Sequence, residues 1–209
     1  MSENVVPRWL QWARQIQAVG QTGLFYNNTR WDAERYQRLM EIAAEIVETY
    51  TELPAEGVLQ NFAVQPGYAT PKVDVRGAVV RDGKILLVQE REDEGWSMPG
   101  GWADVGELPS EMVVREVWEE SGFRVVPRKL VGVFNANGTD DPQEFYHAYR
   151  LIFLCEIAGG EARPSNETLS VGFFHLDDLP ALSIGRTDER QLAEVEAHLR
   201  EPDRPAAFD

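Results

Sequence analysis

The sequence predicts an α/β fold in which a mixed β-sheet is flanked by helices and preceded by a small helical N-terminal domain. Residues 5–50 carry apolar side chains at helical spacing, whereas from Val73 onward the apolar residues alternate or run together as they do in strands. The stretch between them is punctuated by Pro and Gly, which is typical of a connector. We therefore expect a helical domain with its connector over residues 1–66, an α/β domain over residues 67–203 and a polar tail over residues 204–209.

The N-terminal residues predict two amphipathic helices. Their apolar stripes comprise Trp9, Trp12, Ala13, Ile16 and Val19 in the first helix, and Tyr36, Leu39, Met40, Ala43, Ile46, Val47 and Tyr50 in the second. Asp32 is the expected N-cap of the second helix, and residues 51–71 are expected to form the connector. Two helices this short cannot bury both stripes against each other alone. We expect them to pack on the α/β domain, on a second copy of the chain, or on both.

The α/β domain is expected to begin with a hairpin. Asp82-Gly83 separates two β-rich runs, and this dipeptide favours a two-residue hairpin turn. Later apolar runs predict strands at residues 130–134, 145–154 and 170–174, and a closing helix is expected from Thr187 to Leu199.

A further helix is expected between Pro109 and Gly122. Proline suits the first helical turn, where its missing N–H has no partner to lose, and glycine suits the left-handed residue just past the helix end. Leu108 is a poor N-cap, so Ser110 is considered as an alternative start. An apolar face for packing on the sheet is formed by Met112, Val113, Val114 and Val117.

Three carboxylates project from one side of this helix, because Glu116, Glu119 and Glu120 stand at i, i+3 and i+4. Like charges near a helix C-terminus repel one another and are disfavoured by the helix dipole. A divalent cation would convert this repulsion into a binding site, and oxygen-only ligands favour Mg²⁺ or Mn²⁺ over zinc. The alternative is a solvated acidic face of the helix.

The segment Gly101–Phe123 reads GWADVGELPSEMVVREVWEESGF and resembles the Nudix box, G-x5-E-x7-R-E-U-x-E-E-x-G-U with U apolar, without a gap or a substitution. Nudix hydrolases cleave nucleoside diphosphates linked to another group, and their fold is an α/β/α sandwich. The resemblance implies that a metal ion is bound by Glu116, Glu119, Glu120 and the backbone carbonyl of Gly101. It also implies that Arg115 orients a carboxylate, with Glu107 as its partner.

The resemblance extends beyond the box. The segments PRWLQWARQIQAVGQTGLFY, WDAERYQRLMEIAAEI, GYATPKVDVRGAV and VGFFHLDDLP are similar to a bacterial subgroup with a helical N-terminal domain. This similarity implies hydrolysis of CDP-choline, ADP-ribose or related compounds, and one relative also trims RNA from the 3′ end. We expect Mg²⁺-dependent hydrolysis of such a pyrophosphate bond by metal-activated water, with CDP-choline or a nucleotide sugar ahead of ADP-ribose. One alternative is RNA 3′-end trimming. The other is a non-catalytic nucleotide-sensing module, and the intact Glu119, Glu120 and Arg115 disfavour this second alternative.

Several residues outside the helix are candidates for the same site. Asp74 and Arg76 could bind a base and a phosphate, or could equally form a structural ion pair at a sheet edge. Glu167, in the loop from Arg163 to Ser170, is a candidate water-activating base or an extra metal ligand. Trp96 and Trp102 flank the glycine loop, and either could stack on a nucleobase, whereas at least one of the two is expected to pack. The turn-rich residues 136–142 could reach the second group of the substrate.

Composition limits the partners. The formal net charge of −15 argues against a broad grip on nucleic acid, except for a short RNA. Cys155 is the single cysteine, which excludes an intramolecular disulfide and fits a reducing compartment. The sequence shows no leader pattern and no apolar run long enough to span a membrane, so we expect a cytoplasmic enzyme with a small-molecule nucleotide substrate. A homodimer formed through the N-terminal helices is also expected.

Overall fold

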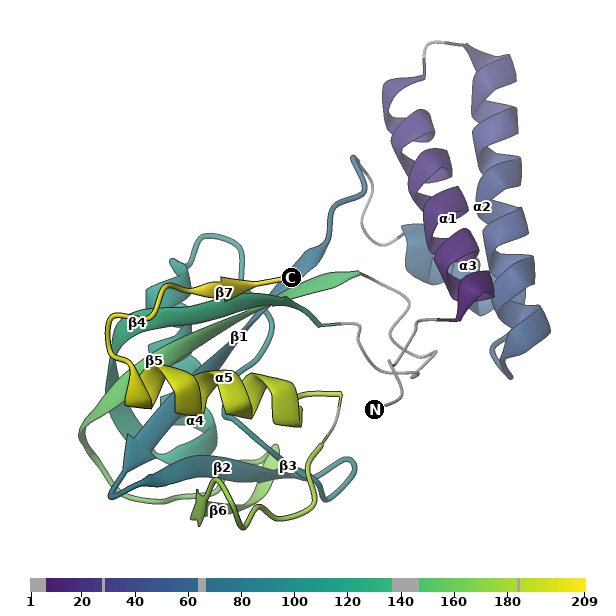
Figure 1. Ribbon diagram of the computed structural model, residues 1–209. Helices are drawn as coiled ribbons and strands as arrows, with labels where there is room; N and C mark the ends of the chain where they lie inside the picture. The colour runs from purple at the N-terminus through teal and green to yellow at the C-terminus, as the bar shows by residue number, and fades with distance from the viewer. Residues whose placement is uncertain (1–6, 28, 64–66, 137–146, 184) are drawn as a thin grey trace. The chain divides into compact units, whose positions relative to one another are not determined.

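The computed structural model describes residues 7–27, 29–63, 67–136, 147–183 and 185–209 (Figure 1). The chain divides into a helical unit that ends at Pro71 and an α/β unit formed by residues 72–136 and 148–209. In the described part of the chain, no helix combines the length and apolar character needed to cross a bilayer.

The helical unit contains α1 (Arg8–Tyr26), α2 (Arg30–Tyr50) and α3 (Ala55–Ala63), and α1 and α2 lie side by side. The prediction that Asp32 caps α2 is wrong. Thr29 is the N-cap, because its hydroxyl accepts from the Asp32 backbone N–H at 3.1 Å and donates to the Asp32 carboxylate at 2.7 Å. The expected connector over residues 51–71 contains the unpredicted helix α3.

The three helices bury a core of their own. Its buried residues are Ala13, Met40, Ala43, Ala44, Val47, Val58 and Phe62. The predicted stripe of α1 is partly wrong, since Trp12 and Val19 are 49% and 56% exposed, whereas Leu10 is buried. The buried face is therefore rotated towards Leu10 and Ala13, and part of the expected apolar stripe faces away from it.

The described residues of the α/β unit form a mixed sheet of seven strands. They are β1 (Lys72–Arg81), β2 (Lys84–Glu90), β3 (Trp96–Ser97), β4 (Phe123–Asn135), β5 (Ala148–Gly160), β6 (Thr168–His175) and β7 (Ala207–Phe208). The strand order is β3-β2-β1-β5-β4-β7, and β6 also pairs with β2. The pairs β1–β5 and β4–β7 are parallel, whereas β1–β2, β2–β3, β2–β6 and β4–β5 are antiparallel.

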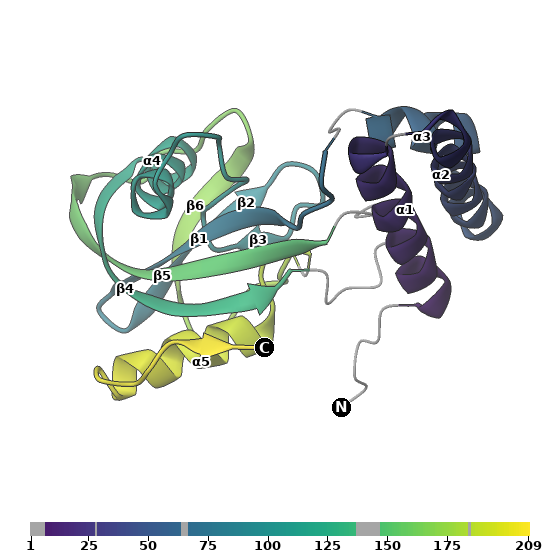
Figure 2. The ribbon, with the colours of Figure 1, turned by 90° about the horizontal axis from the view of Figure 1, so that it is seen from above.

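Helices α4 (Pro109–Ser121) and α5 (Glu189–Arg200) cover opposite faces of this sheet (Figure 2). Beneath α4 lies a core that includes Val75, Val79 and Leu86, and beneath α5 lies one that includes Ala78, Ile85 and Leu87. Neighbouring residues of β1 and β2 thus enter different cores, because successive side chains of a strand point to opposite faces. The predicted α/β/α sandwich with a mixed sheet is confirmed.

Within the α/β unit, the hairpin turn was predicted correctly, whereas the polar tail and the bounds of β5 differ from the prediction. Asp82 and Gly83 form the predicted hairpin turn, with φ of 53° and 74°. Cys155 is buried in the core beneath α4, and burial raises the pKa of its thiol to about 12. The expected polar tail contributes a strand, because Ala207 and Phe208 pair with β4. Of the predicted strand over residues 145–154, the first two residues lie outside the described residues, and β5 continues to Gly160.

Candidate active site

Helix α4 begins and ends as local chemistry requires. Pro109 is the first helical residue and Leu108 stands at the N-cap with no side-chain hydrogen bond, so the alternative start at Ser110 is wrong. At the other end Gly122 has φ of 76°, and its N–H donates to the Trp118 carbonyl. The buried side chains Met112, Val113 and Val117 hold the helix on the sheet as predicted. The glutamates are thereby presented at a fixed angle to the sheet.

The glycine loop before α4 runs along β1 like a further strand. Val75 N–H donates to the Gly101 carbonyl at 2.9 Å, and Gly77 N–H donates to the Pro99 carbonyl at 2.8 Å. This pairing brings Gly101 against α4, where a Cβ on it would lie 2.9–3.0 Å from the Glu116 carboxylate. A side chain at residue 101 would therefore displace Glu116. A carbonyl oxygen has two lone pairs, and the Val75 N–H uses one of those on Gly101.

Arg115 binds several carboxylates at once. Its Nε and Nη2 donate to the two oxygens of Glu107 at 2.9 and 2.8 Å, which confirms the predicted partnership. Its Nη1 lies 2.9 Å from Glu116 and 3.0 Å from Glu119, and Asp104 lies 3.3 Å from Nη2. The hydrogen bond to Glu107 is the main cause that raises the pKa of Arg115, and the same bond lowers the pKa of Glu107. No sequence signal marked Asp104, which belongs to an exposed loop.

Glu120 is the deeply buried glutamate of the helix, with 6% of its surface exposed. Gly100 N–H donates to its carboxylate at 2.9 Å. Burial raises its pKa to about 8, although the charge of Arg76 and the Gly100 N–H oppose that shift. Burial also raises the pKa of the half-buried Glu116. Two glutamates therefore occupy surroundings in which negative charge is costly unless a cation is close.

The predicted metal ligands are not gathered around one point. Among the described residues, no group of three or more His, Cys, Asp or Glu side chains is arranged to hold a metal ion. Glu116 and Glu119 turn to Arg115 instead, while Glu120 turns to the glycine loop. The donors nevertheless fit a hard divalent cation, because all of them are oxygens and Glu120 is a carboxylate buried where its charge needs compensation. The missing Cβ of Gly101 lets the Glu116 carboxylate lie directly against the glycine backbone.

Asp74 and Arg76 lie on a strand in the interior of the sheet, not at an edge. Both are buried, and Asp74 is held by Arg150, whose Nε and Nη2 donate to it at 2.9 and 2.8 Å. Arg76 lies 3.5 Å from Asp74 and donates to the Met98 carbonyl at 3.3 Å. The geometry matches a structural ion pair, with Arg150 as the main partner. Arg150 was missed, because it is 76 residues away in the chain.

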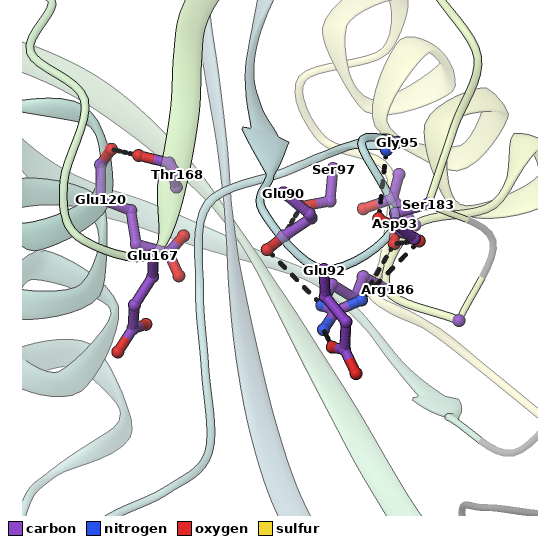
Figure 3. Close-up of polar contacts among 12 residues, drawn as sticks. Glu90, Glu92, Asp93, Gly95, Ser97, Glu120, Glu167, Thr168, Ser183 and Arg186 are labelled. Atoms are coloured by element: carbon purple, nitrogen blue, oxygen red, sulfur yellow. Dashed lines mark hydrogen bonds and ion pairs between the residues drawn. The ribbon is translucent and has the colours of Figure 1, made fainter.

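Glu167 lies close to the end of α4. Its neighbour Thr168 donates a hydrogen bond to the Glu120 backbone carbonyl at 3.1 Å, and the Glu167 carbonyl accepts from Arg91 N–H at 3.1 Å (Figure 3). The side chain itself is exposed. The backbone contacts place the predicted base candidate next to the predicted metal ligands.

Trp96 and Trp102 have different surroundings. Trp96 packs against the core beneath α5, edge-on to Phe174, as expected for at least one of them. Trp102 is 51% exposed, and the Lys72 ammonium lies 6.0 Å from its ring. Of the loop at 136–142, all but Ala136 lies outside the described residues.

A second polar group, which the sequence did not predict, joins the end of β2 to the segment before α5. Glu90, at the end of β2, is buried and accepts a hydrogen bond from Ser97 at 2.5 Å. Arg186, just before α5, lies 3.6 Å from Glu90 and 2.5 Å from Glu92 (Figure 3). In the sequence Glu90 belongs to the charged run EREDE, which is typical of a solvated loop, so nothing marked it as buried.

The geometry and the family comparison agree. Residues 71–195 match the family model described as the NUDIX domain. The chain belongs to the Nudix hydrolase family. Residues 7–62 match a second model, described as a UDP-X-like, N-terminal oligomerisation domain. The matched Nudix residues contain α4 and its glutamates, and the chain is a pyrophosphohydrolase of this family. Divalent metal ions are generally required by Nudix hydrolases.

Its relatives carry related names. A Bacillus subtilis (strain 168) protein named "Putative ADP-ribose pyrophosphatase YjhB" is 40% identical over 206 residues, which cover 99% of this chain and 99% of the relative. The crystal structure of an ADP-ribose pyrophosphatase from Streptococcus suis 89-1591 aligns with a TM-score of 0.60 and 40% identity, over 67% of this Nudix chain and 100% of that one. A crystal structure of a UDP-X diphosphatase aligns with a TM-score of 0.62 and 28% identity over 96% and 98%. The NAD-capped RNA hydrolase NudC of Photorhabdus laumondii is 33% identical over 54% of this chain and 43% of the relative.

Proposed function

We propose that this Nudix hydrolase cleaves the pyrophosphate bond of a nucleoside diphosphate linked to another group, with Mg²⁺ as cofactor and ADP-ribose as the first candidate substrate. The observation that supports it is the placement of Glu120 against the Gly100 N–H, with the Glu116 carboxylate packed so closely against Gly101 that a Cβ there would lie 2.9–3.0 Å from it. ADP-ribose comes ahead of CDP-choline and nucleotide sugars, which the sequence had placed first, because the relative of full length carries that name.

In this proposal Glu116, Glu119, Glu120 and the Gly101 carbonyl hold the cation, for which Mn²⁺ could substitute. When bound, the cation neutralises phosphate oxygens and lowers the pKa of the attacking water. Arg115, fixed by both oxygens of Glu107, keeps Glu116 and Glu119 close together. Positioning of this kind is expected to matter as much as the ligands themselves.

The remaining candidates receive roles that fit their surroundings. Glu167 is proposed to accept a proton from the attacking water, since its backbone lies beside the end of α4. Trp102 is exposed and is proposed to stack on the nucleobase. Arg76 is buried, and its positive charge acts on Glu116 and Glu120. We therefore propose that Asp74 and Arg76 shape the floor of the substrate site and balance its charge.

We also propose a cytoplasmic homodimer formed by the helical unit. The single cysteine, which is buried, fits a reducing compartment. Residues 7–62 match the family model described as an N-terminal oligomerisation domain. Large apolar side chains also remain exposed on the helices and could form the interface: Trp12, Val19, Phe25, Tyr26, Trp31 and Tyr50.

Hydrolysis of NAD-capped RNA is the second candidate, because the NudC relatives share the Nudix part of the chain. The net charge of −15 opposes long contacts with an RNA backbone, so any RNA substrate would be held mainly at its end.

The experiment that tests the proposal is a product assay with Mg²⁺ and, separately, ADP-ribose, CDP-choline, UDP-glucose, a short RNA and the same RNA with an NAD cap. We expect ADP-ribose to be cleaved fastest and the activity to be lost on chelation. Glu119→Gln or Glu120→Gln should lower kcat by about 100-fold or more. The matched control is Glu111→Gln, an exposed glutamate in the first turn of the same helix, which should leave kcat unchanged. Normal turnover in both site variants would refute the assignment.

A further inference from the structure

The proposed substrates are anions, yet the site is rich in carboxylates. We expect an arginine, in addition to the metal, to bind the phosphate groups of the substrate. A guanidinium group binds carboxylate and phosphate with the same paired geometry, so an arginine that is paired with a carboxylate can exchange it for a phosphate. We infer that Arg186, before α5, binds a phosphoryl group of the substrate, and that Glu92 competes with the substrate for it. The inference rests on the proposed function for the identity of the ligand.

Arg76, Arg115 and Arg150 lie close to the same site, and each already binds other groups of the protein. Arg115 holds both oxygens of Glu107 while it also contacts Glu116 and Glu119. Arg150 holds Asp74 through two donors, and both side chains are 3% exposed. Removing a guanidinium from a buried pair leaves an uncompensated charge in the interior. Arg150 therefore cannot turn to a ligand cheaply, and Arg115 could do so only by releasing its paired contact with Glu107.

Arg76, which the sequence marked as a phosphate ligand, is 6% exposed. Its Nη1 donates to the Met98 carbonyl, while its Nε finds no hydrogen-bond partner among the described residues. The Met98–Gly101 segment is bound to β1 by the Gly77 and Val75 amides, and its Met98 carbonyl already occupies this guanidinium. We therefore assign the phosphate contact to a different arginine.

Arg186 differs from Arg76 and Arg150 in the exposure of its partners. Its side chain is 30% exposed, and it pairs with Glu92 and Asp93, whose side chains are 76% and 44% exposed. Exposed ion pairs of this kind stabilise the fold little, because water screens both charges. Arg186 can thus leave them at small cost, while Glu90 remains beside its Nε at 3.6 Å as a buried anchor.

The place of Arg186 is fixed by the same loop that supports the glutamates. Thr187 accepts a hydrogen bond from Met98 N–H at 2.9 Å, and Gly185 accepts one from Arg150 at 3.1 Å. Met98 precedes Gly100, whose N–H binds Glu120. Figure 3 shows Glu90 between Glu120 and Arg186, and the charge of Glu90 is close enough to act on Glu120. A pyrophosphate held at Glu120 would therefore be separated from Arg186 only by the carboxylate of Glu90.

The exchange has consequences in both directions. Removing Arg186 should weaken substrate binding, whereas removing Glu92 should strengthen it, because Glu92 no longer occupies the guanidinium. A purely structural ion pair would respond differently, since loss of either partner would then have the same sign.

The test is steady-state hydrolysis of ADP-ribose with Mg²⁺, together with calorimetric binding of ADP. We expect Arg186→Gln to raise KM about 10-fold or more with kcat within about 2-fold, Arg186→Lys to fall between, and Glu92→Gln to lower KM by roughly 2- to 5-fold. The matched controls are Arg128→Gln and Glu156→Gln, which break an exposed ion pair between β4 and β5 and change the net charge equally. Both controls should leave KM within about 2-fold.

The outcomes separate this inference from the proposed function. If the wild type cleaves ADP-ribose but Arg186→Gln and Glu92→Gln behave like their controls, the role of Arg186 is refuted and the function stands. If the wild type cleaves nothing but ADP binding depends on Arg186 in the expected direction, the function fails and the anion contact stands. Should Arg186→Gln not fold, Glu92→Gln alone decides, because an unchanged KM and an unchanged ADP affinity would refute the competition.

Discussion

Glu120 is expected to make the metal-free protein lose stability as the pH rises. Its carboxyl is buried, and its pKa is raised by burial from 4.5 to about 8. The folded chain therefore binds this proton more tightly than the unfolded chain does. The sign follows from that difference: the contribution is favourable below the unfolded value, and it is lost as the pH rises through the folded value.

The raised pKa of Glu120 sets the size of this change in the free energy of unfolding. One pKa unit corresponds to about 1.4 kcal/mol, so taking up the proton on folding costs about 2 kcal/mol at about pH 6, and at about pH 9, where the folded carboxyl also ionises, the cost is about 5 kcal/mol. Glu120→Gln keeps the shape and can still accept from the Gly100 N–H, but it cannot ionise. We expect this variant to gain about 3 kcal/mol over the wild type across that range, or roughly 6 to 12 °C in melting temperature.

The assay is chemical and thermal unfolding of wild type and Glu120→Gln in EDTA at several pH values, with Glu111→Gln as the control that removes an exposed charge from the same helix. Adding Mg²⁺ at high pH should close the gap, because the cation stabilises the ionised form that the variant lacks. Parallel curves for wild type and Glu120→Gln in EDTA would show that the burial of Glu120 does not carry this cost, and the reasoning would be refuted.

Two further predictions concern the frame around the glutamates. Gly101→Ala should lower kcat by about 10-fold or more with little change in melting temperature, because its Cβ would lie 2.9–3.0 Å from the Glu116 carboxylate. The control is Gly57→Ala, whose Cβ would meet only an ordinary contact. Equal kinetics in the two variants would contradict the prediction. Arg115→Lys keeps the charge but loses the paired contact with Glu107, so it should lower kcat by about 10-fold, and combining it with Glu107→Gln should add little, as a double-mutant cycle would measure; additive losses would mean that the two residues act independently.

Local features of the chain were largely predictable. The turn at Asp82-Gly83 and the helix end at Gly122 depend on backbone conformations that few residues adopt, so the residue types mark them. The contact of Arg115 with Glu119 follows from helical spacing, and its contact with Glu107 was implied by the resemblance to the Nudix box. The error at Asp32 was a displacement within a helix end, where Thr29 and Asp32 are both polar residues suited to the same backbone donors. The error at Ser110 has a different cause, because Pro109 begins α4 although Leu108 offers no side-chain cap.

The surroundings of the charged side chains were not predictable. Arg150 binds Asp74 across 76 residues, and Arg186 contacts Glu92 across 94 residues, so neither pair leaves a periodic signal. Glu90 is buried because β2 ends beneath Ser97 and close to Glu120, although its neighbours in the chain are exposed. The two-residue strand β7 is too short to show an alternation, and it exists because β4 offers it a free edge.

The sequence by itself determined the family, the helix that carries the glutamates and the type of ion that their oxygens suit, since these depend on residues within a few turns of one another. The tertiary structure alone decided which of these carboxylates is buried and which arginine pairs with which carboxylate. Burial and charge pairing depend on segments brought together by folding, so they appear only once the strands and the loop before α5 are in place.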